Sequence, residues 1–506
     1  MNGVPAIAGV LLLHPRDNVF VATRDLAAGW EVAGGIRTQE AIARGHKVAV
    51  ERIAAGSPVL KYGQVIGVAK SDIAPGQHVH VHNLAMTDVR RSAERMQPRV
   101  IEERERTFQG FRRANGRVGV RNYVCVMTSV NCSATVVRMI ADRAGRSGML
   151  RDYPNVDGIV PITHTSGCGM ASEGEGFEIL RRTLWGTATN PNCGATLMVG
   201  LGCEVLQIGE FARDFGLEGR EEFQSYAIQD VGGTRAAVEE GLERLRALLE
   251  IANRAVRTTV PASELVLGLQ CGGSDGWSGI TCNPALGNAA DRLVALGGTV
   301  MLSETPEIYG AEHLLAARAT NPEVAEKLMR RIEWWKEYTA RNRASMDDNP
   351  SPGNIAGGIT TILEKSLGAI AKAGTSPLAD VIEYAEHCKA KGFVFMDSPG
   401  FDPCSATGQV ASGATMIAFT TGRGSAYGCK PSPSIKLASN SELYRRMQDD
   451  MDIDCGPIAT GGATVEEKGD EILTYLLEIA SGRPSKSEAL GYGEVEFVPW
   501  IVGATM

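Results

Sequence analysis

A repeated junction constrains the fold of this chain more than any other feature: in the second half, short apolar strands run directly into polar, glycine-rich loops. These junctions lead from residues 265–269 into Cys271–Asp275, from 300–302 into Ser303–Glu307, from 393–396 into Asp397–Gly400 and from 416–419 into Thr420–Gly424. The pattern predicts a parallel sheet, because the carboxyl ends of parallel strands meet at one edge and form a ligand-binding crevice. Acids, thiols and an arginine at four such ends indicate one site, and therefore an enzyme.

Length and charge narrow the class of protein. The chain has 506 residues, which fits two to four domains. Its net charge of -8 at pH 7 gives no basic field, so we expect a small-molecule substrate and neither a nucleic acid nor a membrane as partner. Residues 6–13 are apolar but too short to cross a membrane, and we expect a strand there. Eleven cysteines without an export signal favour free thiols in a reducing, cytoplasmic setting.

Composition shifts divide the chain into a small all-β module, a linker and two α/β units. Residues 1–83 are rich in valine, isoleucine and glycine with frequent turn signals, which predicts the β-module. Residues 84–107 carry mixed charge and read as a solvated linker. Residues 108–258 repeat the strand-and-loop pattern, and residues 262–506 form the unit described above. Two amphipathic helices are predicted, one with a buried stripe at Val238, Leu242, Leu245, Leu249 and Ala252, the other starting near Pro322 with Leu328, Ile332, Trp335 and Tyr338 on one face.

Carboxylates at the ends of neighbouring strands suggest a cation site. Asp275, Glu304 and Glu307 offer oxygen ligands of the kind that hard divalent cations prefer. Glu307 has a second interpretation, as an acidic residue at a helix start. Arg423 lies between glycines that let a ligand approach the backbone, and its guanidinium suits a substrate carboxylate.

Four basic residues are candidates for proton transfer. Lys365 and Lys436 are the lysines considered for proton abstraction, although most lysines are only solvated. His14 and His46 lie in polar turns of the β-module, and a histidine there can protonate a leaving hydroxyl if the module closes over the site. A structural role is the alternative for both.

The run His78-Val-His80-Val-His82 places three imidazoles on one side of an extended strand, because strand side chains alternate between faces. Such a face can bind a transition metal, contact substrate or another domain, or simply lie in solvent.

Several cysteines follow or end predicted strands, namely Cys132, Cys168, Cys203 and Cys271, and His164 lies in the same loop as Cys168. Thiols at strand ends can bind iron or zinc, but no Cys-x-x-Cys pair fixes a geometry, and buried cysteine as a small apolar residue is the default. Motifs for dinucleotides, nucleotide phosphates and serine hydrolysis are missing from the sequence, so no nucleotide cofactor is expected.

Longer motifs resemble one family. They are Arg112–Asn122, Gly200–Glu204, Cys271–Asp275, Asn349–Asn354, Glu364–Gly368 and Thr420–Gly424, with His14–Asn18, Gly45–Lys47, Lys61–Gly63 and Val79–Asn83 in the β-module. Together they resemble the altronate and galactarate dehydratase family over nearly the whole chain. The Val79–Asn83 run and residues 310–313 are more similar to the altronate branch, whereas Phe401–Ser405, which contains Cys404, matches neither branch.

The resemblance implies a β-clip domain, a linker, a dimerising middle domain and a carboxy-terminal Rossmann-like domain with a metal site. Its members dehydrate sugar acids with a divalent cation, for which we expect Fe2+ first and Mn2+, Mg2+ or Ca2+ as alternatives. The implied metal ligands are Asp275, Glu304, Glu307 and Cys271, and the implied substrate contacts are Arg423, Thr421, Ser274, Asn354, His80 and His82. A homodimer is implied as well.

The expected reaction removes a proton beside a carboxylate and then a hydroxide from the next carbon, giving a 2-keto-3-deoxy acid. A metal on the carboxylate stabilises the enolate-like charge. Two alternatives stay open: a sulfolactate sulfo-lyase, which eliminates sulfite from a related site, and a protein that binds sugar acids without turning them over.

Overall fold

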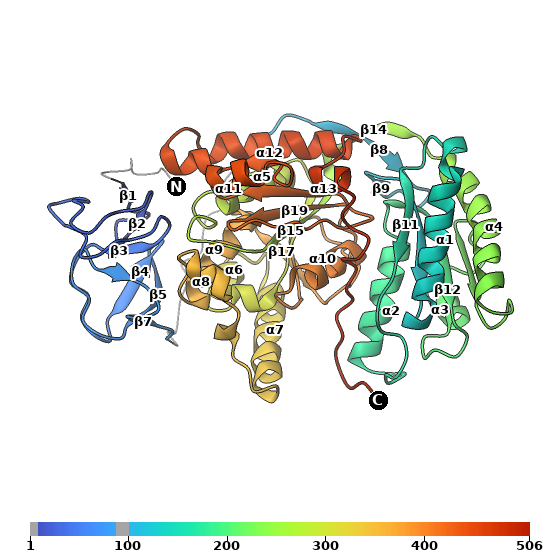
Figure 1. Ribbon diagram of the computed structural model, residues 1–506, viewed down its shortest axis with the longest axis horizontal. Helices are drawn as coiled ribbons and strands as arrows, with labels where there is room; N and C mark the ends of the chain where they lie inside the picture. Colours follow the sequence, from blue (N-terminus) through green and yellow to red (C-terminus); the bar gives the residue numbers. More distant parts are fainter. Residues whose placement is uncertain (1–8, 88–100) are drawn as a thin grey trace.

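The computed structural model describes residues 9–87 and 101–506. Three units lie in a row, with the β-module at one end, residues 262 onward in the centre, and the middle unit of the sequence at the other end (Figure 1). The expected fold class, a small β-module followed by two α/β units, is confirmed. No helix among the described residues is long and apolar enough to cross a membrane.

The β-module consists of two small antiparallel sheets. One has the order β1-β2-β3-β6, formed by Val10–Leu11, Val19–Ala22, Lys47–Ala49 and His78–Val79. The other has the order β4-β5-β7, formed by Pro58–Lys61, Gln64–Ala69 and Leu84–Ala85. Leu84 is buried and pairs with Ala69, so the module extends two residues past the predicted boundary at 83. Of the strand expected at 6–13, residues 10–11 form β1, and residues 6–8 lie outside the described residues.

The prediction that His78, His80 and His82 share one extended strand is wrong. The strand ends at Val79, and the side chain of Asn83 accepts a hydrogen bond from the His80 N–H at 2.9 Å, which turns the chain. Asparagine side chains compete with the strand ladder in this way. Of the predicted linker, residues 88–100 lie outside the described residues, and a strand begins at Thr107.

The middle unit has a four-stranded parallel sheet in the order β11-β10-β12-β13. Its strands are Gly158–Ile162, Tyr123–Thr128, Cys193–Gly200 and Phe223–Ala227. Helices α1 (Ala134–Ser147) and α4 (Thr234–Asn253) cover one face, and α2 (Glu175–Ala188) and α3 (Ile208–Asp214) cover the other. Four residues of the predicted stripe of α4, Val238, Leu245, Leu249 and Ala252, are buried, and the fifth, Leu242, is half-buried against the same core.

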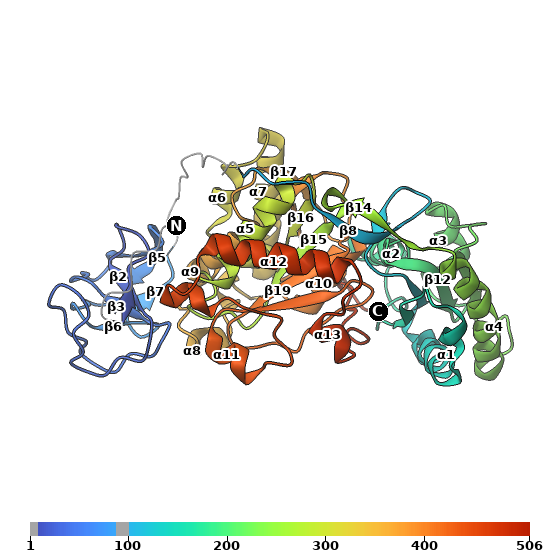
Figure 2. The ribbon, with the colours of Figure 1, turned by 90° about the horizontal axis from the view of Figure 1, so that it is seen from above.

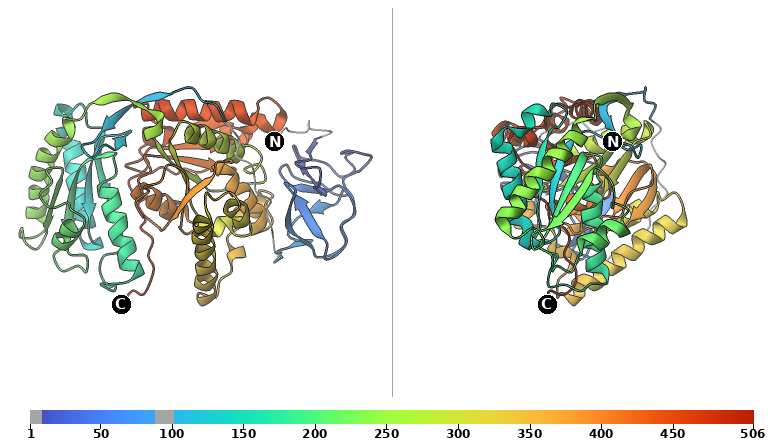
Figure 3. Two further views of the ribbon diagram at one scale, coloured as in Figure 1. Left: turned by 180° about the vertical axis from the view of Figure 1, so that it is seen from behind. Right: turned by 90° about the vertical axis from the view of Figure 1, so that its right-hand side faces the viewer.

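A three-stranded antiparallel sheet, β14-β8-β9, joins the middle unit to the central unit. It is formed by Arg257–Pro261, Thr107–Arg112 and Val118–Gly119. The C-terminal segment also returns to the middle unit, where the Met506 N–H donates to the Gly169 carbonyl at 2.8 Å (Figure 3).

The central unit has a seven-stranded sheet in the order β17-β18-β16-β15-β19-β20-β21, parallel throughout, as the junctions predict. Its strands are Leu378–Ile382, Gly392–Met396, Thr299–Leu302, Val266–Cys271, Met416–Thr421, Ser434–Ala438 and Ile453–Asp454. Helices α5 (Cys282–Ala295) and α12 (Val465–Ala480) pack together over one face, where α12 spans the sheet in Figure 2. Helix α10 (Asp402–Ala411) packs between β15 and α2. Helix α7 (Pro322–Arg341) contacts β17 and buries Leu328, Ile332 and Trp335 as expected, whereas Tyr338 of the predicted face is half-buried.

Candidate active site

Two carboxylates and a thiol converge at the edge of the central sheet, where β15 and β16 end. Cys271 is the last residue of β15, Glu304 follows β16, and Glu307 lies in the 3-10 turn Thr305–Ile308. The ligand atoms of these three buried residues all lie within 4.8 Å of one another. Neighbouring strands β15 and β16 therefore bring together three of the four predicted metal ligands.

Two lysines supply positive charge to this acidic cluster. Lys365 donates to Glu307 Oε1 at 2.7 Å and to Asn349 Oδ1 at 2.6 Å. Lys372 Nζ lies 2.7 Å from Cys271 Sγ and 3.6 Å from Glu304 Oε2. Burial opposes ionisation of Glu307, but the two ammonium groups outweigh it and lower the pKa of that carboxyl. Burial raises the pKa of the Cys271 thiol to about 12, so the thiol keeps its proton at neutral pH.

Glu304 is the strained member of the cluster. Its φ is 72°, a left-handed backbone that side chains other than glycine rarely adopt, and the residue is 0 % exposed. Neither carboxylate oxygen has a hydrogen-bond partner within the described part of the chain. Burial and the charge of Glu307 raise its pKa well above the ordinary value. A buried, strained carboxylate without hydrogen bonds is the arrangement expected where a ligand completes the site.

Asp402, which the sequence did not single out, also belongs to this cluster. It begins α10, and its carboxylate lies so close to Gly272 that a Cβ on the glycine would be 2.1 Å from Asp402 Oδ2. Burial and the charge of Glu307 raise the pKa of Asp402 to about 7. The group can therefore gain and lose a proton near neutral pH.

The acidic cluster fits a divalent cation by its donor atoms. Two carboxylates and a thiol suit iron, manganese or zinc, and the Glu304 oxygens accept no hydrogen bond from the described residues. Lys365 and Lys372 already neutralise part of the negative charge, so a cation competes with two ammonium groups for the same ligands.

Asp275, the fourth predicted metal ligand, lies outside the group of ligand atoms. Its Oδ1 accepts from the N–H groups of Trp277 and Ser278 at 3.1 and 2.9 Å, and the Ser439 hydroxyl contacts both of its oxygens. Hydrogen bonds therefore saturate this carboxylate, which ties the loop after β15 to the loop after β20.

The β-module docks on the central unit through a buried ion cluster. Glu364, on α9 (Ile362–Ile370), accepts from Lys47 at 2.9 Å and from Lys61 at 2.8 Å. All three side chains are at most 2 % exposed. Burial opposes ionisation of Glu364, but the two lysines outweigh it and lower its pKa, whereas burial lowers the pKa of Lys47 to about 8.

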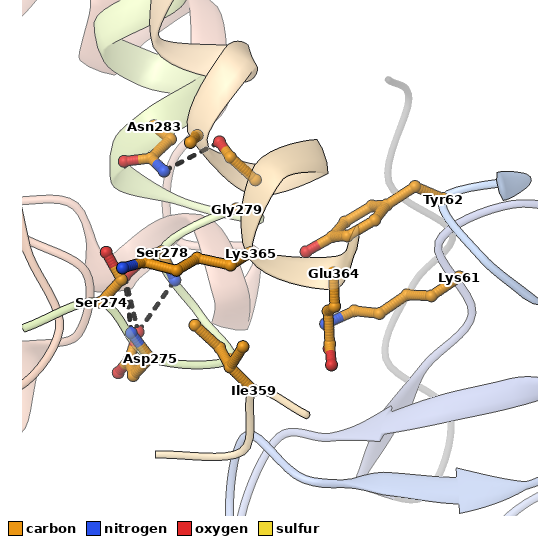
Figure 4. Close-up of a pocket in the computed structure, with 13 residues that line it drawn as sticks. Lys61, Tyr62, Ser274, Asp275, Ser278, Gly279, Asn283, Ile359, Glu364 and Lys365 are labelled. Carbon is orange, nitrogen blue, oxygen red and sulfur yellow. Dashed lines mark hydrogen bonds and ion pairs between the residues drawn. The ribbon is translucent and has the colours of Figure 1, made fainter. Parts of the chain in front are cut away.

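A small cavity of about 10 Å³ lies at this docking surface, enough for one water molecule. In Figure 4, Lys61, Tyr62 and Glu364 line one side, and Asp275 and Lys365 line the other. Of the predicted substrate contacts, Ser274 lines the cavity. The side chain of Asn354, another predicted contact, donates to the backbone carbonyl of Ser274 at 2.8 Å. Because Lys365 also binds Glu307, the cavity adjoins the acidic cluster.

A histidine cluster lies beside the docked surface. His46, His78 and His80 have ring nitrogens within 4.8 Å of one another, and His46 Nε2 lies 3.3 Å from the Ala356 carbonyl of the central unit. Burial lowers the pKa of His78 to about 3 and that of His80 to about 4, with smaller contributions from the other histidines and from Lys47, so both are neutral at pH 7. Neutral imidazoles can bind a metal. His82 is exposed and forms a second such group with Glu40 and His78.

The other predicted residues are not among the ligand atoms of the acidic cluster. His14 packs on the turn at Gly63, and its Nδ1 accepts from the Arg16 N–H at 3.1 Å. Lys436 is buried in β20 and donates to the Tyr427 carbonyl at 2.8 Å. Arg423 is exposed beside Gly273, and the hydroxyl of Thr421 accepts from the Gly424 N–H at 3.0 Å.

Cys132, Cys168, Cys203 and His164 all lie on the middle unit, at the carboxyl edge of its sheet. The three thiols are exposed and free. His164 is buried and uses both ring nitrogens: Nε2 lies 3.1 Å from the Thr128 carbonyl, and Nδ1 accepts from the Ser166 N–H at 3.2 Å.

Three family models match successive parts of this chain. Residues 8–87 match the altronate/galactarate dehydratase SAF domain, 110–253 the second domain of D-galactarate dehydratase/altronate hydrolase, and 262–505 the C-terminal domain of D-galactarate/altronate dehydratase. The chain belongs to the altronate and galactarate dehydratase family. The predicted family and the predicted enzyme class, a hydro-lyase, are therefore confirmed.

Relatives differ in the activity for which they are named. The altronate dehydratase of Bacillus subtilis is 36 % identical over 493 residues, which is 96 % of this chain and 97 % of that protein. The galactarate dehydratase (L-threo-forming) of Escherichia coli is 38 % identical over 93 % of this chain and 92 % of that protein. The (2R)-sulfolactate sulfo-lyase subunit beta of Chromohalobacter salexigens is 33 % identical over 78 % of this chain and 97 % of that protein.

Proposed function

We propose that this protein is a metal-dependent dehydratase that converts an altronate-like aldonate or aldarate into a 2-keto-3-deoxy acid. The observation that supports it best is Glu304, a buried, strained carboxylate without hydrogen bonds, next to Cys271 and Glu307. Family membership supports the reaction class, and the names of the full-length relatives support the sugar-acid substrate.

In this proposal Glu304, Glu307 and Cys271 hold the cation, with Fe2+ as the first choice. The cation supplies Lewis acidity that stabilises negative charge on the substrate carboxylate. Lys365 carries a raised pKa, because its attraction to Glu307 outweighs the effect of burial. It is therefore protonated at neutral pH and donates hydrogen bonds to substrate oxygens, so it does not act as the base.

Asp402 is the proposed proton carrier. With a pKa of about 7 it can take the proton beside the carboxylate and return it to the departing hydroxide. We assign to Arg423, which is exposed beside the loop that follows Cys271, the role of orienting the acid group. We propose that the β-module separates from the central unit to admit substrate, because the cavity between them, of about 10 Å³, is too small for a six-carbon acid.

The experiment measures keto-acid formation from a panel of aldonates and aldarates, with protein purified without oxygen and supplied with ferrous iron. Turnover of one member, abolished by a chelator and restored by iron, is the expected result. Glu304→Gln should lose turnover together with one equivalent of bound divalent cation per chain, whereas Glu442→Gln, an exposed control, should keep both. Retention of that equivalent by Glu304→Gln would place the cation elsewhere.

Sulfite elimination is the second candidate, because a sulfo-lyase subunit is 33 % identical over most of this chain. Release of sulfite from sulfolactate, with no turnover of the sugar acids, would favour it. Binding of sugar acids without any turnover would instead identify a binding protein. We further propose a cytoplasmic location, since eleven unpaired thiols favour a reducing compartment. A homodimer is proposed from the family resemblance alone.

A further inference from the structure

The middle unit carries a second concentration of metal-binding side chains. Of the eleven cysteines, the only ones that are exposed are Cys132, Cys168 and Cys203, and the rest are buried or half-buried. The three exposed cysteines follow β10, β11 and β12, which are adjacent in the sheet. Because parallel strands end at one edge, all three thiols lie at the same side of the unit.

Hydrogen bonds fasten the three loops to one another. The Asn131 N–H donates to the Ser166 carbonyl at 3.0 Å, and the Val205 N–H donates to the Gly167 carbonyl at 3.2 Å. The Ser129 hydroxyl donates to Glu204 Oε1 at 2.6 Å. Each cysteine is therefore within two residues of a bond that joins its loop to a neighbouring loop.

The loops after β10 and β11 pack closely against each other at this edge. Gly167 has a φ of 100°, and a Cβ there would lie 2.5 Å from the Ser129 carbonyl. His164 braces the same loop with both ring nitrogens, so it positions Cys168 and has no nitrogen left for a metal. Helix α1 begins two residues after Cys132 and has no acidic residue in its first turn, so its positive end favours a thiolate there.

The spacing of the thiols distinguishes between metal centres. A single zinc or iron ion binds sulfur at about 2.3 Å, which places its cysteine sulfurs about 4 Å apart. The three sulfurs here are not all within 4.8 Å of one another. A cube of four irons and four sulfides holds its cysteine sulfurs farther apart, because each sulfur binds a different corner.

We propose that Cys132, Cys168 and Cys203 bind a [4Fe–4S] cluster at the edge of the middle unit. Each thiol gives its proton to the ligand that it displaces from an incoming cluster and then binds one iron, so loading needs no oxidant or reductant. Three cysteines leave the fourth iron without a protein thiolate, open to water or to a carboxylate or hydroxyl oxygen. This site lies on a different unit from the acidic cluster around Glu304.

The test measures iron, acid-labile sulfide and the visible and paramagnetic resonance spectra of the full-length protein, purified without oxygen and loaded with sulfide and with ferrous and ferric iron in equal amounts, so that assembly needs no further oxidant. We expect about four irons and four sulfides per chain bound as a cluster. Cys132→Ser, Cys168→Ser and Cys203→Ser should each lower cluster content at least several-fold, with circular dichroism unchanged. Cys388→Ser, a half-buried control, should retain it.

Iron bound without sulfide, a disulfide among the three thiols in place of iron, or full cluster content in all three variants would each overturn the proposal. Keto-acid formation is measured separately, so failure here and failure of the proposed function are distinguishable. Glu304→Gln should lose turnover and keep the cluster spectrum.

Discussion

Glu364→Gln tests whether the buried ion cluster holds the β-module against the central unit. The carboxylate lies between Lys47 and Lys61 at 2.9 and 2.8 Å, and no member of the cluster is more than 2 % exposed. Removing one partner of a buried pair costs about 3–5 kcal/mol, because the other charges stay buried without compensation. A glutamine amide here also turns an N–H group towards one of the two ammonium groups.

The substitution weakens the docked state in particular, because both lysines belong to the β-module and Glu364 belongs to α9 of the central unit. A loss of about 3–5 kcal/mol corresponds to a docking equilibrium about 150- to 5000-fold weaker. Hydrogen–deuterium exchange should rise at the contact between β5 and α9, where Thr361 donates to the Ile66 carbonyl at 2.6 Å.

Glu442→Gln is the matched control, because Arg44 and Glu442 also join the two units, at 2.9 Å, but are 34 % and 60 % exposed. Exposed pairs contribute about 0–1 kcal/mol, so exchange should barely change. Equal, small effects of the two substitutions would refute the role given to burial.

Three other substitutions test neighbouring features. Gly276→Ala should undock the β-module, because its Cβ would lie 2.2 Å from the Gly45 carbonyl, whereas Gly353→Ala, with its nearest atom 3.6 Å away, should leave hydrogen exchange unchanged. Glu304→Gly should abolish turnover yet raise the thermal midpoint, since relief of the φ of 72° is worth about 1–2 kcal/mol; a lower midpoint would contradict the strain. Asp402→Asn should lose the change in turnover rate near pH 7 that the wild-type protein shows when the rate is measured against pH. Because the pKa of Asp402 is raised from 3.8 to about 7 on folding, wild-type stability should decline relative to Asp402→Asn between about pH 4 and pH 7, as urea midpoints can show.

The sequence predicted the features that depend on local periodicity. The buried stripe of α4 has helical spacing, and the junctions of the central sheet each join a short apolar strand to a polar loop. Both patterns could therefore be predicted without tertiary information. The junctions also located Glu304 and Glu307, because adjacent parallel strands bring their carboxyl ends together whatever the order of the remaining strands.

What the sequence missed depends on side-chain hydrogen bonds and on contacts distant in sequence. Asp275 lies in the loop after a strand, as the other acids do. Hydrogen-bond donors from its own loop and from the loop after β20 occupy its oxygens. Lys372 lies in a short 3-10 turn with no motif around it, yet it reaches Cys271 across 101 residues of sequence. The prediction that His80 lies on an extended strand was wrong because the side chain of Asn83 accepts a hydrogen bond from the His80 N–H and turns the chain there.

Helix α9 explains how docking and chemistry are connected. Consecutive helical residues point about 100° apart, so Glu364 and Lys365 face different partners. Glu364 accepts from the lysines of the β-module, while Lys365 donates to Glu307 in the acidic cluster. If separation of the β-module shifts α9, Lys365 would move relative to Glu307, and loss of that ion pair would raise the pKa of the carboxyl. In the proposed mechanism the charge of the metal ligands would then depend on whether the β-module is docked, which would connect substrate entry to the state of the site.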